Sequence, residues 1–397
     1  MAGRCEFGFQ FSVFGFSGLA LDSQLLTLRS SITLLTPRGR GAVATLRFEG
    51  PCESIDRFFA AANGELLHQQ PLNRVAFGHW GREVSEEVVL CRTSENVAEI
   101  HCHGGDAAAD RIHRDLKSQG AETESWPEML QRTEGIFLRE WAEAIAKATT
   151  QRTAELLLAQ RELFPQVIRD LESGVASDLA SRIDSLLEWA KFGRHLTRPW
   201  SVVLGGPPNV GKSSLINALL GYARSIVYDQ PGTTRDVVTA ETAFEGWPIL
   251  LADTAGLRDR AEILEAEGIA RAKNRLASAD CQVLLFDVSQ PPVETDRQLR
   301  EEFPDAIFVA HKSDLPEHRS CAFPDHSLRV SSLTGEGVEQ LLKTTVDRLI
   351  PEVPEPGQPI PFTDRQVDLL TKAREAAVAG DKGAITAISS EILGSPY

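Results

Sequence analysis

The sequence predicts three structural parts: an N-terminal α+β domain, an α-helical domain, and an α/β domain with a doubly wound sheet, inserted between two parts of the helical domain. Three observations lead to this prediction. Short apolar runs separated by turn residues fill residues 31–124, and apolar residues at helical spacing fill residues 125–198. In residues 199–350 nearly all-apolar runs alternate with helical segments, and a proline-rich linker at 351–361 leads to two more helices in 362–397.

Size and charge limit the class of protein. With 397 residues the chain is long enough for two or three domains, and its 42% hydrophobic and 24% charged residues are ordinary for a globular protein. The net charge of −15 disfavours a surface that coats nucleic acid, so contact with RNA requires a local basic patch or a partner protein. Six cysteines without a Cys-x-x-Cys pair indicate a reducing, cytoplasmic setting, and no apolar stretch is long enough to predict a membrane span.

Residues 1–30 are predicted to be an extension without an assigned fold. Arg4 precedes a run of phenylalanines from Phe7 to Phe16, which loosely resembles the apolar core of a signal peptide. Polar residues such as Gln10 interrupt this run, and no clean small-residue cleavage site follows it. We therefore do not expect a signal peptide.

The α+β domain over 31–124 is predicted from apolar runs bounded by glycine and proline turn signals. One helix is expected after the last strand. The expected strands are Ile32–Leu35, Ala42–Phe48, Val88–Cys91 and Val97–Cys102, and the expected helix covers Asp110–Gln119.

The helical domain is predicted in two parts, 125–198 and 362–397, on either side of the α/β domain. Leucine, isoleucine and aromatic residues recur every three to five positions, so these stripes are interpreted as core. Pro165 is expected to break or kink its helix because proline lacks an amide hydrogen. The second part consists of helices over Asp364–Ala379 and Lys382–Leu393.

The α/β domain over 199–350 is predicted from runs that are apolar on both faces, as parallel strands covered by helices are. The expected strands are Ser201–Leu204, Ile249–Ala252, Val283–Val288, Ile307–Ala310 and Leu328–Val330, and Val338–Ile350 is the closing helix.

The strongest motif is Gly206-Pro207-Pro208-Asn209-Val210-Gly211-Lys212-Ser213, which lies between the first of these strands and a helix. Glycines allow the backbone to wrap a phosphate, and the amides with the helix N-terminus supply positive potential. In such a loop Lys212 reaches the β- and γ-phosphates and the Ser213 hydroxyl ligates Mg²⁺. The alternative is a glycine-rich turn with a chance lysine. The predicted nucleotide-binding residues of this loop are Asn209, Val210, Gly211, Lys212, Ser213 and Ser214.

Two further motifs fit a bound Mg²⁺–nucleotide. Asp253-Thr254-Ala255-Gly256 follows a strand, so Asp253 can hold the metal through water and Gly256 can present an amide to the γ-phosphate. The alternative for Asp253 is a helix N-cap. Thr234, in the loop Gly232-Thr233-Thr234-Arg235-Asp236, is expected to complete the Mg²⁺ shell, although by itself this loop reads as a common turn.

Two motifs predict recognition of guanine. Asp314, in His311-Lys312-Ser313-Asp314, can accept N1–H and the exocyclic amine of guanine, a donor pair that adenine lacks. The segment Ser331-Ser332-Leu333-Thr334-Gly335 follows the last strand and can present an amide to the guanine O6. The predicted binding residues here are His311, Lys312, Asp314, Ser331, Ser332 and Leu333, which complete a P-loop GTPase domain.

These motifs resemble those of translation-factor-related GTPases and, within them, the MnmE (TrmE) family of tRNA modification GTPases. The loop at 206–217, the loop at 232–236 and Asp253–Arg258 all match that family, and so does Glu265–Ala272. The resemblance implies that Glu265 orients the attacking water, with Lys212 and Thr234 as the other catalytic residues. A solvated acidic face is the alternative for Glu265.

The resemblance also implies potassium activation of the hydrolysis of GTP to GDP. Asn209 stands at the position of the family's K⁺-binding asparagine, and Tyr228, Gln230 and Thr233 are expected to supply further oxygens. Such a cation replaces an arginine finger in stabilising the developing charge.

Residues outside the α/β domain carry the resemblance further. Thr36–Val43 resembles the opening of the family's N-terminal domain, and His103-Gly104-Gly105 resembles a later turn in it. The resemblance implies a homodimer formed through this domain, a formyl-tetrahydrofolate bound in it, and a flavin-containing, MnmG-like partner in modifying the wobble uridine of tRNA.

Two departures from the family stand out. His311 replaces an asparagine of the guanine motif, which is expected to weaken nucleotide affinity. The family's Cys-x-Gly-Lys tail is missing after Gly394, so the chain is interpreted as a divergent, C-terminally truncated member in which GTP hydrolysis survives and tRNA modification is in doubt. The alternatives are an Era- or Der-like ribosome-assembly GTPase and a non-modifying, GTP-dependent interaction switch.

Overall fold

A computed structural model describes residues 29–39, 41–173, 176–222, 239–253, 273–321, 323–324 and 326–394. The chain divides into two compact units, Met1–Met129 and Leu130–Tyr397. Within the described ranges, no helix is long and apolar enough to cross a membrane.

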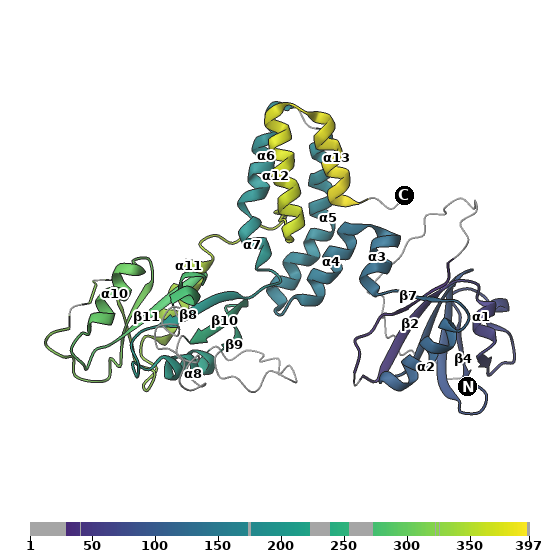
Figure 1. The fold of residues 1–397 in the computed structure, drawn as a ribbon, viewed down its shortest axis with the longest axis horizontal. Helices are drawn as coiled ribbons and strands as arrows, with labels where there is room; N and C mark the ends of the chain where they lie inside the picture. Colours follow the sequence, from purple (N-terminus) through teal and green to yellow (C-terminus); the bar gives the residue numbers. More distant parts are fainter. Residues whose placement is uncertain are drawn as a thin grey trace, which may run out of the picture. The chain divides into compact units, whose positions relative to one another are not determined.

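The first unit is a seven-stranded sheet with a helix on one face (Figure 1). Its strand order is β3-β4-β5-β6-β2-β1-β7, and all neighbours pair antiparallel except β7, which runs parallel to β1. The strands are β1 Ser31–Leu34, β2 Val43–Glu49, β3 Phe59–Ala61, β4 Val75–Trp80, β5 Glu86–Ser94, β6 Val97–His103 and β7 Glu122–Thr123; the helices are α1 Glu53–Asp56, η1 Leu67–Gln69 and α2 Asp106–Lys117.

The core of this unit lies between the sheet and helix α2. Trp80, at the end of β4, is fully buried, and its indole N–H donates to Asp115 of α2 at 2.9 Å. Strands β1, β2, β5 and β6 confirm the four predicted strands, and α2 begins four residues earlier than expected. Strands β3 and β4 were not predicted. Strand β3 pairs with β4, and β4 also pairs with β5, so both depend on partners elsewhere in the chain.

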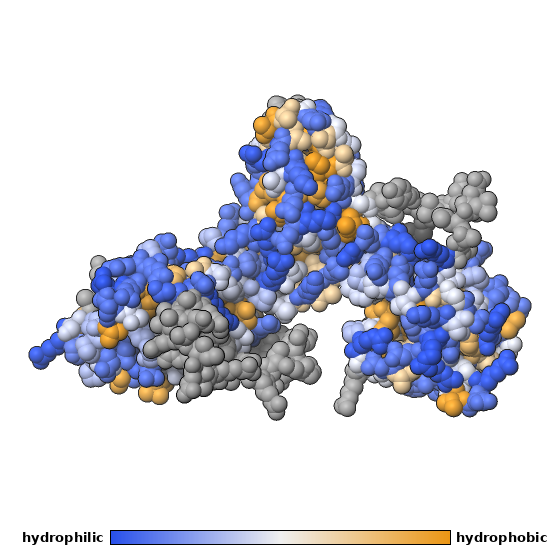
Figure 2. Space-filling model, in the orientation of Figure 1, coloured by the Kyte–Doolittle hydropathy of each residue, from blue (hydrophilic) through white to orange (hydrophobic). Residues whose placement is uncertain are grey.

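The second unit contains a helical bundle and the α/β domain. Figure 1 shows helices α5, α6, α12 and α13 side by side, and α12 packs against α6 and α13. Figure 2 shows that hydrophobic groups gather at the upper part of this bundle, whereas the visible face of the α/β domain is mainly hydrophilic. The helices are α3 Trp126–Glu134, α4 Ile136–Lys147, α5 Gln151–Ser173, α6 Ala176–Glu188, α7 Ala190–Arg194, α12 Asp364–Ala379 and α13 Lys382–Leu393.

Helix α5 runs through Pro165 as one element, so a break there is wrong, and a kink stays a prediction. Proline removes one backbone hydrogen bond. The neighbouring side chains Phe164 and Ile168 are fully buried in the bundle core, and this packing holds the helix together across the missing bond.

The α/β domain has a six-stranded sheet of order β13-β12-β11-β8-β10-β9, in which only the edge strand β9 runs antiparallel. Strand β9 was not predicted, and the five parallel strands were. The elements are β8 Trp200–Gly205, α8 Lys212–Tyr222, β9 Thr239–Phe244, β10 Trp247–Asp253, β11 Cys281–Asp287, α10 Glu294–Glu302, β12 Ile307–His311, β13 Leu328–Val330 and α11 Val338–Leu349.

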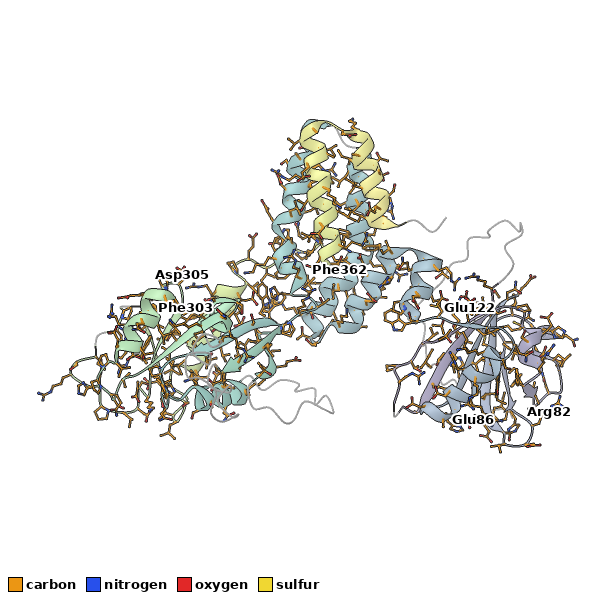
Figure 3. The ribbon with its side chains drawn as sticks, viewed as in Figure 1. Arg82, Glu86, Glu122, Phe303, Asp305 and Phe362 are labelled. Atoms are coloured by element: carbon orange, nitrogen blue, oxygen red, sulfur yellow. The ribbon has the colours of Figure 1, made fainter. Side chains whose placement is uncertain are left out.

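The chain returns from this domain to the bundle through the proline-rich linker. The second half of this linker is hydrogen-bonded to helix α5. The side-chain amide of Gln160, on α5, donates to the carbonyl of Gln358 at 3.0 Å and accepts the amide of Ile360 at 2.8 Å. Phe362, marked in Figure 3, is buried between α4 and α5 against Phe137 and Phe164. The end of the linker is therefore part of the bundle core.

Candidate functional site

The loop after strand β8 has a backbone that only glycine adopts easily at two points. Gly206 has φ 142° and Gly211 has φ 105°. A Cβ on Gly206 would lie 2.5 Å from the carbonyl oxygen of Leu285, and one on Gly211 would lie 2.4 Å from the His311 ring. Asn209 also has a positive φ, 63°, which asparagine tolerates better than most residues. The loop is thus shaped as a close-fitting cradle of backbone amides.

Lys212 is buried at the start of helix α8, and its ammonium group lies over the loop. It donates to the carbonyls of Gly206 at 3.1 Å and Pro207 at 3.0 Å. The helix N-terminus and this charge give the loop a positive potential, which favours an anion such as a phosphate. Ser214 lies exposed in the first turn of the same helix.

Ser213, in the first turn of helix α8, meets Asp253 at the carboxyl end of strand β10. The hydroxyl of Ser213 donates to Oδ2 of Asp253 at 2.8 Å, and Asp253 is buried at the end of strand β10. A hydroxyl and a carboxylate at this distance are the hard oxygen donors that Mg²⁺ uses beside phosphate. The residues present therefore fit the predicted metal.

His311 is buried at the end of strand β12 and connects two loops of the site. Its Nδ1 lies 2.7 Å from the carbonyl of Val210, so Nδ1 carries the proton and donates, while Nε2 accepts from the Ser332 hydroxyl at 3.2 Å. Burial lowers the pKa of His311, which keeps the ring neutral. His311 thereby ties the phosphate loop to the segment after β13.

Lys312 connects the phosphate loop to strand β11. Its ammonium donates to the carbonyl of Asn209 at 3.2 Å and to Oδ2 of Asp287 at 2.6 Å. Burial alone would raise the pKa of Asp287, but hydrogen bonds from Lys312 and Ser289 outweigh it and the pKa is lowered. Asp287 is a site residue that the sequence analysis missed. It could have been found, because it ends an apolar parallel strand, as Asp253 does.

Asp314 is an exposed carboxylate that a buried serine holds in place. The hydroxyl of Ser331, which is fully buried, donates to Oδ1 of Asp314. The same hydroxyl oxygen accepts the backbone amides of Leu333 and Thr334, each at 3.2 Å. A fixed carboxylate next to a backbone turn is the arrangement that a guanine base needs for two hydrogen bonds to its Watson–Crick edge.

The structure brings together Asn209, Val210, Gly211, Lys212, Ser213, Ser214, Asp253, His311, Lys312, Asp314, Ser331, Ser332 and Leu333 at the carboxyl ends of the parallel strands and the loops that follow them. The remaining predicted site residues, Tyr228, Gln230, Thr233, Thr234, Thr254, Ala255, Gly256 and Glu265, lie outside the described residues.

Comparisons with known proteins agree with this geometry. Residues 201–312 match the family described as "50S ribosome-binding GTPase". The tRNA modification GTPase MnmE of Geobacillus thermodenitrificans (strain NG80-2) is 31% identical over 86% of both chains. The MnmE of Synechococcus sp. (strain WH7803) is 32% identical over 89% of both, and that of Prochlorococcus marinus (strain MIT 9303) is 33% identical over 89% of this chain and 87% of its own.

The chain belongs to the MnmE family of tRNA modification GTPases. Its GTPase domain is the α/β domain that carries the site, and the similarity to MnmE proteins extends beyond it to most of the chain. An MnmE-family GTPase domain therefore accounts for the phosphate loop and for the guanine-type carboxylate Asp314 together.

Proposed function

We propose that this protein binds GTP and hydrolyses it to GDP and phosphate, as a switch linked to modification of the wobble uridine of tRNA. The observation that carries this proposal is that one domain holds both the Gly206–Ser213 loop and Asp314. Hydrogen bonds hold each of them in place. One end of this site suits a triphosphate and the other suits guanine. Membership of the MnmE family supports the link to tRNA.

The phosphates would be held by the loop amides, with Lys212 exchanging its two loop carbonyls for phosphate oxygens. Ser213 and Asp253 would hold Mg²⁺, which supplies charge neutralisation at the transferred phosphate. Asp253 would act through a coordinated water, because its Oδ2 already accepts the hydrogen bond of the Ser213 hydroxyl at 2.8 Å.

The proposal includes residues outside the described ranges. Glu265 would orient the attacking water, and Thr234 would complete the Mg²⁺ shell. Asn209, Tyr228, Gln230 and Thr233 would hold K⁺ against the developing charge. Equal GTPase rates in K⁺ and Na⁺ would contradict the potassium part alone.

The wider role that we propose follows from the MnmE relatives. The domain over residues 31–124 would form a homodimer and bind a formyl-tetrahydrofolate, and a flavin-containing, MnmG-like protein would be the partner in tRNA modification. The helical domain would comprise 125–198 and 362–397, with the GTPase domain at 199–350 between them. The proposed compartment is the cytoplasm.

The test is calorimetry of GDP and ADP binding in the presence of Mg²⁺. Wild-type protein should prefer GDP, and Asp314→Ala should weaken GDP binding by about 100-fold or more, because the guanine donors lose a charged acceptor. ADP binding should not change. Asp347→Ala, which removes an exposed carboxylate from helix α11 of the same domain, is the matched control. Equal affinity of the wild type for GDP and ADP would end the proposal.

A second measurement separates this function from two others. Glu265→Ala should retain GDP binding and lose multiple-turnover phosphate release, whereas a non-catalytic interaction switch would show no turnover in either protein. The description "50S ribosome-binding GTPase" also favours a test of co-sedimentation with ribosomal particles. GTP-dependent co-sedimentation would support a ribosome-assembly role instead.

A further inference from the structure

A cavity of about 350 Å³ lies at the foot of the helical bundle, away from the nucleotide site. Helix α4 forms one wall, the segment from α7 to Arg198 forms another, and the start of α12 forms the third. Phe362, labelled in Figure 3, lines it at the point where the linker joins the bundle. All of these segments belong to the second unit.

Positive charge predominates in this cavity. Five basic and three acidic side chains line it, although the whole chain has a net charge of −15. One pair is already matched: Arg365 binds Glu140 through two hydrogen bonds, of 2.6 Å and 2.9 Å. The four other cations face two carboxylates: Arg139 forms an ion pair with Glu143 at 3.6 Å, and Arg194 and Arg198 share Asp364. These cations are Arg139, Lys147, Arg194 and Arg198, and the carboxylates are Glu143 and Asp364.

Several of these cations have unused donors. Nε of Arg139 and Nε of Arg194 are buried without a hydrogen-bond partner, which is rare in folded proteins. Arg194 Nε does lie 2.8 Å from Asp364 Oδ1, but it is not aimed at that oxygen and forms no hydrogen bond. These two nitrogens have almost no accessible surface, so an anion in the cavity would contact the exposed parts of the two side chains instead.

The two remaining cations lie at the solvent side. The Arg198 side chain is 66% exposed and makes one hydrogen bond, to Asp364 at 2.9 Å, so most of its five N–H groups remain available. Lys147 is exposed at the last residue of helix α4 and has no ion-pair partner among the described residues. Exposed cations beside a cavity suit a ligand that extends beyond it.

We propose that this cavity binds the phosphodiester backbone of RNA, with Lys147 and Arg198 contacting successive phosphates. The proposal rests on the proposed tRNA role, which provides the RNA, and it supplies the local basic patch that an acidic chain needs for RNA contact. Phosphate contacts of this kind position the RNA and do not read its sequence. The site therefore holds tRNA without selecting which tRNA is modified.

The experiment measures the binding of tRNA to the full chain by fluorescence anisotropy over a series of salt concentrations. Lys147→Gln/Arg198→Gln should weaken binding and reduce the slope of log K against log salt by about 2, or about 1 for each lost phosphate contact. The loss should be the same for an RNA of unrelated sequence. The matched control is Lys372→Gln/Lys382→Gln, which removes two exposed cations outside the cavity and should leave the slope unchanged.

The GTPase rate and the Tm in the presence of inorganic phosphate are measured on the same variant. The GTPase rate of Lys147→Gln/Arg198→Gln should equal that of the wild type, so failure of the RNA site and failure of the GTPase function are distinguishable. An unchanged salt slope overturns the proposal, and so does an absence of tRNA binding in the wild type. If inorganic phosphate raises the Tm of the wild type but not of the variant while tRNA binding stays equal, the cavity is a small-anion site and the proposal is wrong.

Discussion

The GTPase domain and the N-terminal unit are both built on a sheet, but they differ in how their strands are joined. In the GTPase domain five of six strands are parallel, so the loops that follow these strands all begin at the same edge of the sheet. In the N-terminal unit six strands form antiparallel pairs, and β2 lies between β1 and β6, which is distant in sequence.

This difference explains why motifs located the site of the GTPase domain and located none in the N-terminal unit. A parallel sheet gathers short contiguous segments at one edge, so each segment carries its own recognisable residues. In the antiparallel sheet the close approach of Gly104 to Gly41 joins residues more than sixty positions apart. Substitutions in one region should therefore leave the other region unaffected.

The largest effect is expected at Lys212. Lys212→Ala should reduce the GTPase rate by about 10²–10³-fold, because the phosphate loop loses the cation at the start of helix α8. Multiple-turnover phosphate release measures this, and Lys343→Ala, an exposed lysine on helix α11, is the control. Thermal unfolding of the N-terminal unit should not shift. A rate within a factor of about two of the wild type would contradict the assignment of this loop.

The counterpart in the N-terminal unit is Trp80. Trp80→Ala should lower the free energy of unfolding of that unit by about 3–5 kcal/mol, because it removes a fully buried ring and its hydrogen bond to Asp115. Urea unfolding measures the loss, and Trp80→Phe should retain part of the packing. The GTPase rate should stay unchanged. A parallel loss of GTPase activity would show that the two regions are energetically coupled.

A smaller effect is expected at Asp280, at the start of strand β11. Burial alone would raise its pKa, but hydrogen bonds from His195 and Ser201 outweigh this and hold the pKa far below its ordinary value. Asp280→Asn should destabilise the GTPase domain by about 1–3 kcal/mol at neutral pH. A depressed carboxylate pKa stabilises the fold above the unfolded pKa and loses this effect as pH falls through the folded pKa. Wild type and variant should therefore converge in acid, and a constant difference would contradict the hydrogen-bonded carboxylate.

The smallest effect is expected at His311. Because burial lowers its pKa from about 6.5, the folded state favours the neutral ring, and stability is lost as pH falls from that value towards the folded pKa. His311→Asn should remove this dependence, worth about 1 kcal/mol or less between about pH 7.5 and about pH 5.5. Denaturant unfolding at the two pH values measures it. Identical pH dependence of the two proteins would exclude a buried neutral His311.

Much of the fold followed from local pattern alone. The five parallel strands and helices α11, α12 and α13 lie within one or two residues of their predicted bounds, because apolar runs and helical spacing are properties of a short segment. The phosphate loop follows the same logic, since its glycines occupy backbone conformations that other residues avoid. These features required no knowledge of distant residues.

Other features depended on partners that a linear pattern does not reveal. Strands β3, β4 and β9 form by pairing with neighbours, and Pro165 is tolerated because the buried bundle core holds helix α5. The pairing of Asp287 with Lys312 likewise joins the ends of two adjacent strands.

The amino-acid sequence by itself therefore determined which residues can bind phosphate and guanine, because those chemistries need particular side chains at short spacing. Only the tertiary structure decided how they are held: His311 between Val210 and Ser332, and Asp314 on the buried Ser331. The physical reason is that hydrogen bonds between segments depend on atoms within about 3 Å, and only folding brings residues far apart in the chain to that distance.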